Sequence, residues 1–447
     1  MRKHIGSLTC AAIFCLAAAL RIYTFVFPHN HGDQIIYAAL AQNIAENNSY
    51  NLLSTEIVKT NISGYSFFSY NHCEKNSPRS IANLFKKGGA DLYSDNLFYR
   101  PPLFPFTIRL LSFNRQILSF AINNLFRAQN VSWKSCRLKP YGKYFELWLK
   151  KQTVDNLFLI ATKQLPVTFP SFLGSLLIFA GVIYLANSFS KTAAVWAALI
   201  AAFAPVDIFC ATRVLSDSMM TGFLLWSFIF AVKCQGKKSF FLSLPLILAA
   251  VYTKESAAVI CSASFFIIAI KNKKAKKFLF LSAFSFACFI PWLIILFLKN
   301  GSHLSVVYHH APLRAYWYTG AFSRNYFFHF YFPFYLYPVL LFSIVYYFSA
   351  FTQKDFRRNF LVVVPIATLI IITILQQKEC RQILPAYPFL YVSAALGLEK
   401  FREKINARFQ PAAGFVIILL IILMSAYHAF MKISPSLFGN AGGIFLT

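Results

Sequence analysis

Acidic residues are scarce in this sequence. Asp and Glu number 15 in 447 residues, against 43 Lys and Arg, and the formal net charge is +28. Charged residues of both signs make up only 13% of the chain, whereas hydrophobic residues make up 57%. Because a soluble domain has about 25% charged residues, this composition excludes an ordinary soluble protein.

The sequence also lacks the usual signatures of soluble enzymes and metal proteins. It contains no glycine-rich phosphate loop, no nucleophile elbow and no zinc-type cluster of Cys and His. Its nine cysteines are odd in number and lie mostly inside apolar runs, so we expect most to be small core residues. Cys73 and Cys136 share a long polar stretch, where they would be able to pair in an oxidising compartment.

Long apolar runs are abundant instead. A helix of roughly 17–25 residues crosses the ~30 Å hydrocarbon core of a membrane. Eleven runs approach this length, at residues 5–27, 165–187, 192–210, 214–232, 239–253, 256–270, 278–298, 331–350, 359–376, 382–398 and 411–430. They predict an all-α integral membrane protein of about 11 transmembrane helices, with a first helix at 1–27 and the main bundle at 165–430.

Basic residues predict the orientation of this bundle, since short loops rich in Lys and Arg stay in the cytoplasm. With the N-terminus inside, every second connection is basic, at 188–191, 233–238, 271–277, 352–358 and 399–408. The long loop 28–164 and the short tail 431–447 then lie on the non-cytoplasmic side. Attraction to anionic lipid explains these basic loops, and we therefore expect no nucleic-acid binding.

The loop 28–164 holds just over half of the acidic residues of the chain. A connection this long and this polar is usually functional or disordered. Apolar residues at helical spacing, Ile36, Leu40 and Ile44, predict a helix that lies along the membrane surface. The stretch 101–126 has a similar character, and its opening pair of prolines is expected to direct the chain into a helix.

Two carboxylates stand at the mouths of apolar runs. Asp33 follows the first run, and Asp217 lies at the head of the run 214–232. An ionisable residue at the depth or edge of a membrane indicates a functional site. The structural alternatives are that Asp33 caps a helix, which contributes about 1 kcal/mol, and that Asp217 complements a helix dipole.

Several motifs occur in the order found in one enzyme family. A first run ending near Arg21 is followed by Gly32-Asp33, Tyr37 and Tyr50, and this pattern resembles the opening of GT-C-fold glycosyltransferases of the protein O-mannosyltransferase and lipid A aminoarabinose transferase type. Further segments resemble later motifs of the family: Tyr99–Leu103, Thr212–Asp217, Thr253–Glu255, Pro291-Trp292, Arg381, Leu384-Pro385 and Tyr387-Pro388.

The resemblance implies a GT-C-like membrane enzyme that takes a sugar from a polyprenyl-phosphate donor. Transfer would occur on the non-cytoplasmic face, to a lipid, glycan or protein acceptor. Asp33 would accept the proton of the acceptor hydroxyl, and direct displacement would invert the anomeric centre without a second nucleophile. Asp217 would be the second catalytic carboxylate.

The donor phosphate needs cationic partners at the headgroup level. Arg100 is the strongest candidate because a guanidinium binds phosphate through two hydrogen bonds, and Arg213, Lys254 and Arg381 lie on the same predicted face. The alternative without a role in phosphate binding is that these residues only anchor the helices at the membrane interface. The resemblance further suggests that three tyrosines line the substrate site, namely Tyr37, Tyr99 and Tyr387.

Two positions depart from the family pattern. Many relatives have a second carboxylate directly after the first, but this chain has Gln34 there. A divalent cation requires several oxygen ligands, so we do not expect Asp33 alone to hold a metal. The alternative is a metal shared by Asp33 and Asp217. Arg100 stands where the family has Lys, which keeps the charge and changes the geometry.

Two other classes share this composition. A polytopic transporter or lipid flippase would also be basic inside, but the chain shows no convincing internal repeat, and its notable charges gather at one face. A non-catalytic relative is the third class, with Gln34 as the mark of lost activity. The compact size and short termini favour a bacterial inner membrane over the endoplasmic reticulum.

Overall fold

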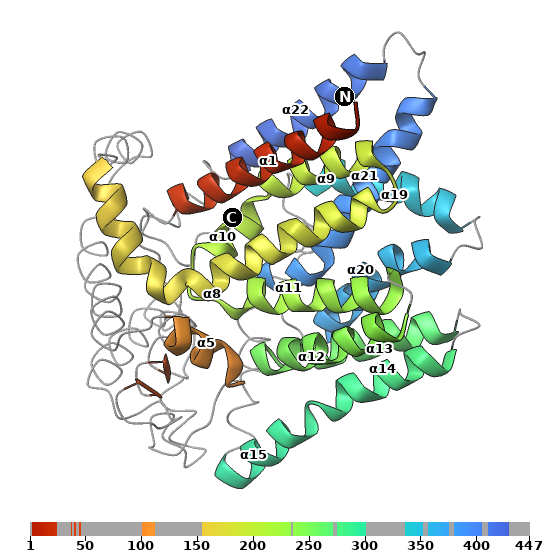
Figure 1. The fold of residues 1–447 in the computed structure, drawn as a ribbon. Helices are drawn as coiled ribbons and strands as arrows, with labels where there is room; N and C mark the ends of the chain where they lie inside the picture. The colour runs from red at the N-terminus through yellow and green to blue at the C-terminus, as the bar shows by residue number, and fades with distance from the viewer. Residues whose placement is uncertain are drawn as a thin grey trace, which may run out of the picture.

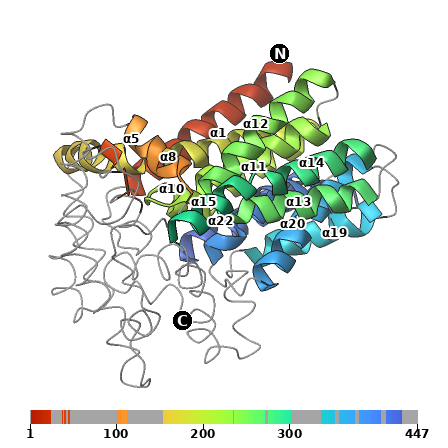
Figure 2. The ribbon, with the colours of Figure 1, turned by 90° about the horizontal axis from the view of Figure 1, so that it is seen from below.

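The computed structural model describes residues 2–24, 37, 40–41, 44–45, 101–111, 154–233, 236–270, 275–300, 336–351, 356–374, 380–404 and 410–428. All regular elements in these ranges are helical, as the sequence predicts. The long helices run alongside one another as a bundle, and the short α5 (Leu103–Leu111) lies beside α8 (Val154–Asn187; Figures 1 and 2).

Seven helices each correspond to a single apolar run of the sequence, although α8 begins at Val154, inside the predicted loop 28–164. They are α1 (Arg2–Thr24), α8 (Val154–Asn187), α12 (Lys237–Thr253), α13 (Ser256–Ile270), α19 (Tyr337–Phe351), α20 (Phe356–Ile374) and α22 (Gln410–His428). Among the described residues, two stretches are long and apolar enough to cross a membrane, Val167–Asn187 and Lys276–Leu298, and several shorter apolar helices accompany them. The chain is an integral multi-pass membrane protein, whereas the count of 11 spans stays a prediction.

Other apolar runs contain breaks that a simple reading of hydropathy does not predict. The run 192–210 was expected as one span, but it forms α9 (Lys191–Ala202) and α10 (Pro205–Ala211), bent by 61°. Pro205 is the first residue of α10, where its missing N–H costs nothing and its ring prevents α9 from continuing.

Three further runs change helix type or direction. In each case a proline or a wider helical turn marks the change. The segments are α11 (Ser216–Phe228) with the π-helix η1 (Ile229–Lys233), α14 (Ala275–Ala287) with α15 (Ile290–Asn300), and the 3-10 helix η4 (Cys380–Ala386) with α21 (Tyr387–Glu403).

Small residues allow two pairs of helices to pack with their backbones in contact. A Cβ atom on Gly174 of α8 would collide with the backbone of Met219 in α11, and one on Gly222 would lie 2.9 Å from the carbonyl oxygen of Gly174. A Cβ atom on Gly397 of α21 would likewise meet the carbonyl oxygen of Phe342 in α19. Such contacts are typical of helices that pack inside membranes.

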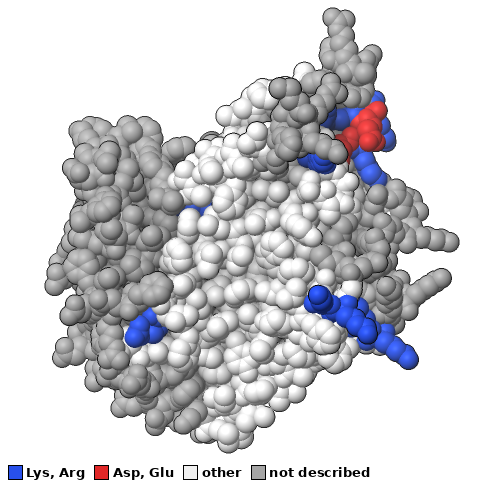
Figure 3. Space-filling model, viewed as in Figure 1, with Lys and Arg blue, Asp and Glu red and all other residues white. Residues whose placement is uncertain are grey.

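The outer surface has a broad apolar face. Figure 3 shows this uncharged field, with most of the Lys and Arg side chains visible in that view at one edge. Large hydrophobic side chains such as Phe280, Leu298 and Phe415 are exposed on the outer helices. Lipid contact explains this exposure, because the hydrocarbon core is a favourable environment for such side chains.

A candidate active site at the start of helix α11

Asp217 lies in the first turn of α11, where the helix dipole favours a negative charge. The helix begins after Leu215, whose backbone is extended, and no side chain caps it. Asp217 is therefore not the capping residue, and its carboxylate is available for other partners. Its side chain is almost completely buried, with 1% exposed.

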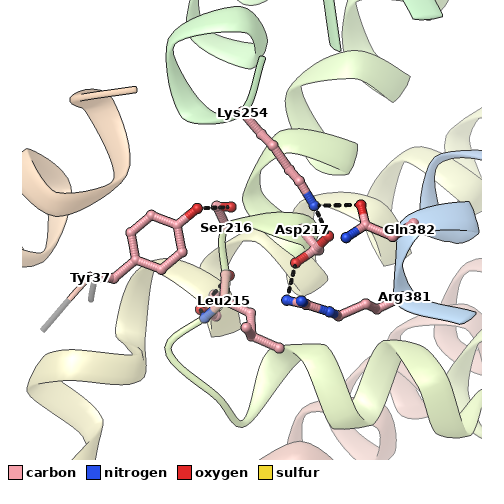
Figure 4. A network of polar contacts seen from close by, with 8 residues as sticks. Tyr37, Leu215, Ser216, Asp217, Lys254, Arg381 and Gln382 are labelled. Carbon is pink, nitrogen blue, oxygen red and sulfur yellow. Dashed lines mark hydrogen bonds and ion pairs between the residues drawn. The ribbon is translucent and has the colours of Figure 1, made fainter. Parts of the chain in front are cut away.

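Two cations converge on this carboxylate (Figure 4). Lys254, at the end of α12, donates from Nζ to Oδ1 of Asp217 at 2.5 Å and to Oε1 of Gln382 at 2.8 Å. Arg381 of η4 approaches Oδ2 of Asp217 at 3.5 Å. Lys254 is 5% exposed and Arg381 2% exposed, so all three charges lie inside the protein. The break before α21 is what brings Arg381 and Gln382 to this place.

The cluster of Asp217, Lys254 and Arg381 carries a formal charge of +1. Charges removed from water are stable only when they are paired. Lys254 and Arg381 also supply several N–H donors, which suit the oxygens of a phosphate. The arrangement can therefore bind an anionic group of a ligand at the place where Asp217 now pairs.

Tyr37 connects the segment after α1 to this cluster. Its hydroxyl lies 2.7 Å from Oγ of Ser216, and its ring meets the ring of Phe104 in α5 edge-on at 4.8 Å between centroids. The long first loop therefore reaches the mouth of α11, as the sequence predicts. Positions 37, 40–41 and 44–45 are helical, as predicted for this segment, whereas its place along the membrane surface stays a prediction.

Three predicted site residues lie outside the part of the chain that the structure describes. Asp33 precedes Tyr37 by one helical turn in sequence, and Tyr99 and Arg100 directly precede Pro101 at the entry to α5. Their neighbours, Tyr37 and α5, lie at the site. The roles of these three residues stay predictions.

Arg213 and Tyr387 lie close to the cluster in sequence. The guanidinium of Arg213 stacks on the ring of Phe209 at 3.4 Å from its centroid, and the side chain is buried. Tyr387 is fully buried at the start of α21, where its ring lies 6.1 Å from that of Tyr391.

Sequence reasoning missed Gln382 and a second buried ion pair. A single glutamine at the end of an apolar run gives no pattern that marks it. Arg21 pairs with Asp207 at 2.5 Å in the interior, and both side chains are buried. Asp207 was detectable in principle, because it is one of only 15 acidic residues and lies inside the apolar run 192–210.

The site offers poor ligands for a metal. The described residues contain no group of three or more His, Cys, Asp or Glu side chains that could hold a metal ion. Both oxygens of Asp217 face cationic groups, which would repel a divalent cation. A metal shared by Asp33 and Asp217 is therefore disfavoured at its Asp217 end.

Two models of protein families match separate parts of the chain. Residues 155–295 match the dolichyl-phosphate-mannose-protein mannosyltransferase family. Residues 316–446 match the Alg9-like mannosyltransferase family. No curated protein is significantly similar to the chain in sequence.

Solved structures show where the fold occurs elsewhere. ArnT from Cupriavidus metallidurans, in the apo state and bound to undecaprenyl phosphate, is similar with a TM-score of 0.50 at 12% identity, over 98% of this chain and 75% of ArnT. The archaeal oligosaccharyltransferase AglB from Archaeoglobus fulgidus, in complex with an inhibitory peptide and a dolichol-phosphate, gives the same score and identity over 98% of this chain and 56% of AglB. At this identity the likeness shows a shared fold.

Proposed function

We propose that this chain, a polyprenyl-phosphate-dependent membrane glycosyltransferase of the GT-C type, holds the phosphate of its donor at the start of α11. The observation that carries the proposal is the meeting of Lys254 and Arg381 on one buried carboxylate. Both cations present N–H donors beside Asp217, and a sugar-phosphate diester carries one negative charge with oxygens that accept such bonds. Arg100 and Arg213 complete the phosphate-binding set in this proposal.

The transfer step follows from this placement. Asp33 accepts the proton of the acceptor hydroxyl as the hydroxyl oxygen bonds to the anomeric carbon. The bond from that carbon to the phosphate oxygen breaks, its electron pair stays on the oxygen, and polyprenyl phosphate leaves. Lys254 and Arg381 stabilise the charge that develops on the leaving phosphate. A single displacement inverts the anomeric centre.

Asp217 has a supporting part in this step. Before the donor binds, its carboxylate keeps Lys254 and Arg381 paired and in place. When a phosphate occupies the cluster, Asp217 stays beside the reacting centre as the second carboxylate. Tyr37, Tyr99 and Tyr387 line the substrate site, and the acceptor is a lipid, a glycan or a protein.

The site faces the non-cytoplasmic side in this proposal. Exposed lysines mark the starts of α12 and α14, and these helices run from there toward the end of the bundle where α5 lies (Figure 1). Short basic connections are retained in the cytoplasm, so the end with the site is the non-cytoplasmic one. A bacterial inner membrane is the proposed location.

Replacement of Lys254 by Met tests the phosphate site. The variant keeps an unbranched side chain and removes the charge, so undecaprenyl phosphate should bind at least about tenfold more weakly to the purified protein. Lys276→Met is the matched control, because Lys276 is exposed at the start of α14, and its affinity should not change. Equal affinity of wild type and Lys254→Met, with both folded, would place the phosphate elsewhere.

A further inference from the structure

A buried arginine joins four helices at the bend between α9 and α10. Arg21 has no exposed surface. Its nitrogen atoms donate to acceptors on α1, α8, α9 and α10: Ala17 O at 3.0 Å, Ser175 Oγ at 2.6 Å, Ala201 O at 3.3 Å, Ala202 O at 3.4 Å and Asp207 Oδ2 at 2.5 Å.

These contacts stabilise the helix ends that meet at the bend between α9 and α10. The carbonyl groups of Ala201 and Ala202 lie in the last turn of α9, where a cation is favourable. The carbonyl of Ala201 also accepts from the N–H of Ala204 at 3.4 Å. Asp207 lies in the first turn of α10, where a carboxylate is favourable. Arg21 therefore satisfies the end of one helix and, through Asp207, the start of the next.

Helix α10 depends on such contacts for its position. It has seven residues, and isolated helices of fewer than about 12 residues are not stable in water or by propensity alone. Asp207 accepts from both Arg21 and Ser175, the latter at 3.0 Å. Oδ1 of Asp207 is buried and has no hydrogen-bond partner among the described residues, so the charge of Asp207 depends on Arg21 and Ser175 for its compensation.

The segment that connects α10 to α11 leads to the active site. Its second end is bound to the same face of α8 as its first. Ser171 lies one turn before Ser175 and contacts Leu215 twice, accepting from its N–H at 3.2 Å and donating to its carbonyl at 2.9 Å. Residues four apart share a helix face. The segment from Asp207 to Leu215 is thus fastened to α8 at both ends, and Asp217 follows directly.

We propose that Arg21 is a positioning residue, which acts through Asp207 and Ser175 to set the place of Asp217 and of the donor-phosphate site. The chemistry of Arg21 is purely structural, since its guanidinium touches no reacting atom. Its effect on the reaction passes through α10 and the residues up to Leu215. The link to donor binding rests on the proposed function, whereas the link to the position of α11 does not.

Two variants separate this role from general stability. Ser175→Ala removes the hydroxyl that joins Arg21 to Asp207 and leaves the ion pair. The double variant Arg21→Met with Asp207→Leu removes both buried charges together, and such replacements often leave stability unchanged or raise it. Ser282→Ala is the matched control, because Ser282 bonds Ser262 across α13 and α14 away from the site.

Hydrogen exchange over residues 205–222 and binding of undecaprenyl phosphate are measured on each purified variant. Ser175→Ala and the double variant should exchange faster at 212–217 and bind undecaprenyl phosphate about 3- to 30-fold more weakly, a range typical of coupled residues. Ser282→Ala should change neither. Unchanged exchange at 212–217 in both test variants would overturn the positioning role. Failure of the wild type to bind undecaprenyl phosphate counts against the proposed function, and the exchange measurement still decides the positioning role.

Discussion

Asp217 holds Lys254 and Arg381 at once, and solvent hardly reaches any of the three side chains. Removal of one partner from a buried ion pair costs about 3–5 kcal/mol, because the other charge is left uncompensated. Replacement of Asp217 would leave two buried cations without this carboxylate. A loss of donor binding in that variant would then be indistinguishable from a loss of folding. Replacement of Lys254 leaves Asp217 with Arg381, so its effect reports on the phosphate site more directly.

Asp33→Asn tests the proposed base. The amide cannot accept the acceptor proton, and loss of general-base catalysis lowers rates by about 100- to 10,000-fold. We expect this fall in transfer from radiolabelled polyprenyl-phosphate sugars, supplied as a panel to membranes that contain the variant. Binding of undecaprenyl phosphate should persist, which shows that the variant is folded. Transfer at the wild-type rate would remove Asp33 from the mechanism.

Individual site residues differ in how far the sequence reveals them. Asp217, Lys254 and Arg381 were all predicted, because each is a rare charge at the mouth of an apolar run and matches a family motif. The contacts among these three residues depend on the directions of their side chains, which sequence spacing does not determine. Gln382 was missed because its role comes only from the position of Lys254 in space.

Helices α8 and α11 position the site because their backbones touch. Gly174 faces the backbone of Met219, which is two residues after Asp217. Contact of this kind leaves no room for a shift of α11 along α8. The start of α11 is therefore held against α8 by close packing at Gly174 and by the hydrogen bonds of Ser171.

Gly174→Ala should push α11 away from α8. The added methyl group meets backbone atoms, which cannot rotate aside, and overpacking of this kind costs about 1–3 kcal/mol. We expect a lower midpoint of thermal unfolding and weaker transfer. Gly414→Ala is the control, because its Cβ would meet flexible side-chain atoms of Arg402 at 3.1 Å and of Trp196 at 3.2 Å. Equal unfolding midpoints for the two variants would contradict this packing.

The positions of most helices were predictable, whereas their breaks were not. Hydropathy detects a run such as 192–210 because most of its residues are apolar. Hydropathy does not report the direction of the helix axis. The bend arises from Pro205 together with the pairing of Arg21 and Asp207, two residues far apart in sequence. Local sequence contains the proline but not the partner that stabilises the bend.

The whole molecule is arranged as an apolar bundle with its chemistry at one end. The glycosyltransferase class, predicted from ordered motifs, is confirmed by the two family matches and the shared fold. The transporter alternative rested on composition alone. Transporters and membrane glycosyltransferases share that composition. The sugar and the acceptor were not predictable, because specificity comes from pocket contacts rather than from the fold.

The most direct test of the central claim is an experimental structure of the protein with undecaprenyl phosphate, determined by cryo-electron microscopy. The account predicts the phosphate at the start of α11, with its oxygens at about 3 Å from Nζ of Lys254 and from the guanidinium of Arg381. Asp217 should then share these cations with the phosphate. A phosphate bound elsewhere, with the contacts of Lys254 to Asp217 and Gln382 unchanged, would contradict the account.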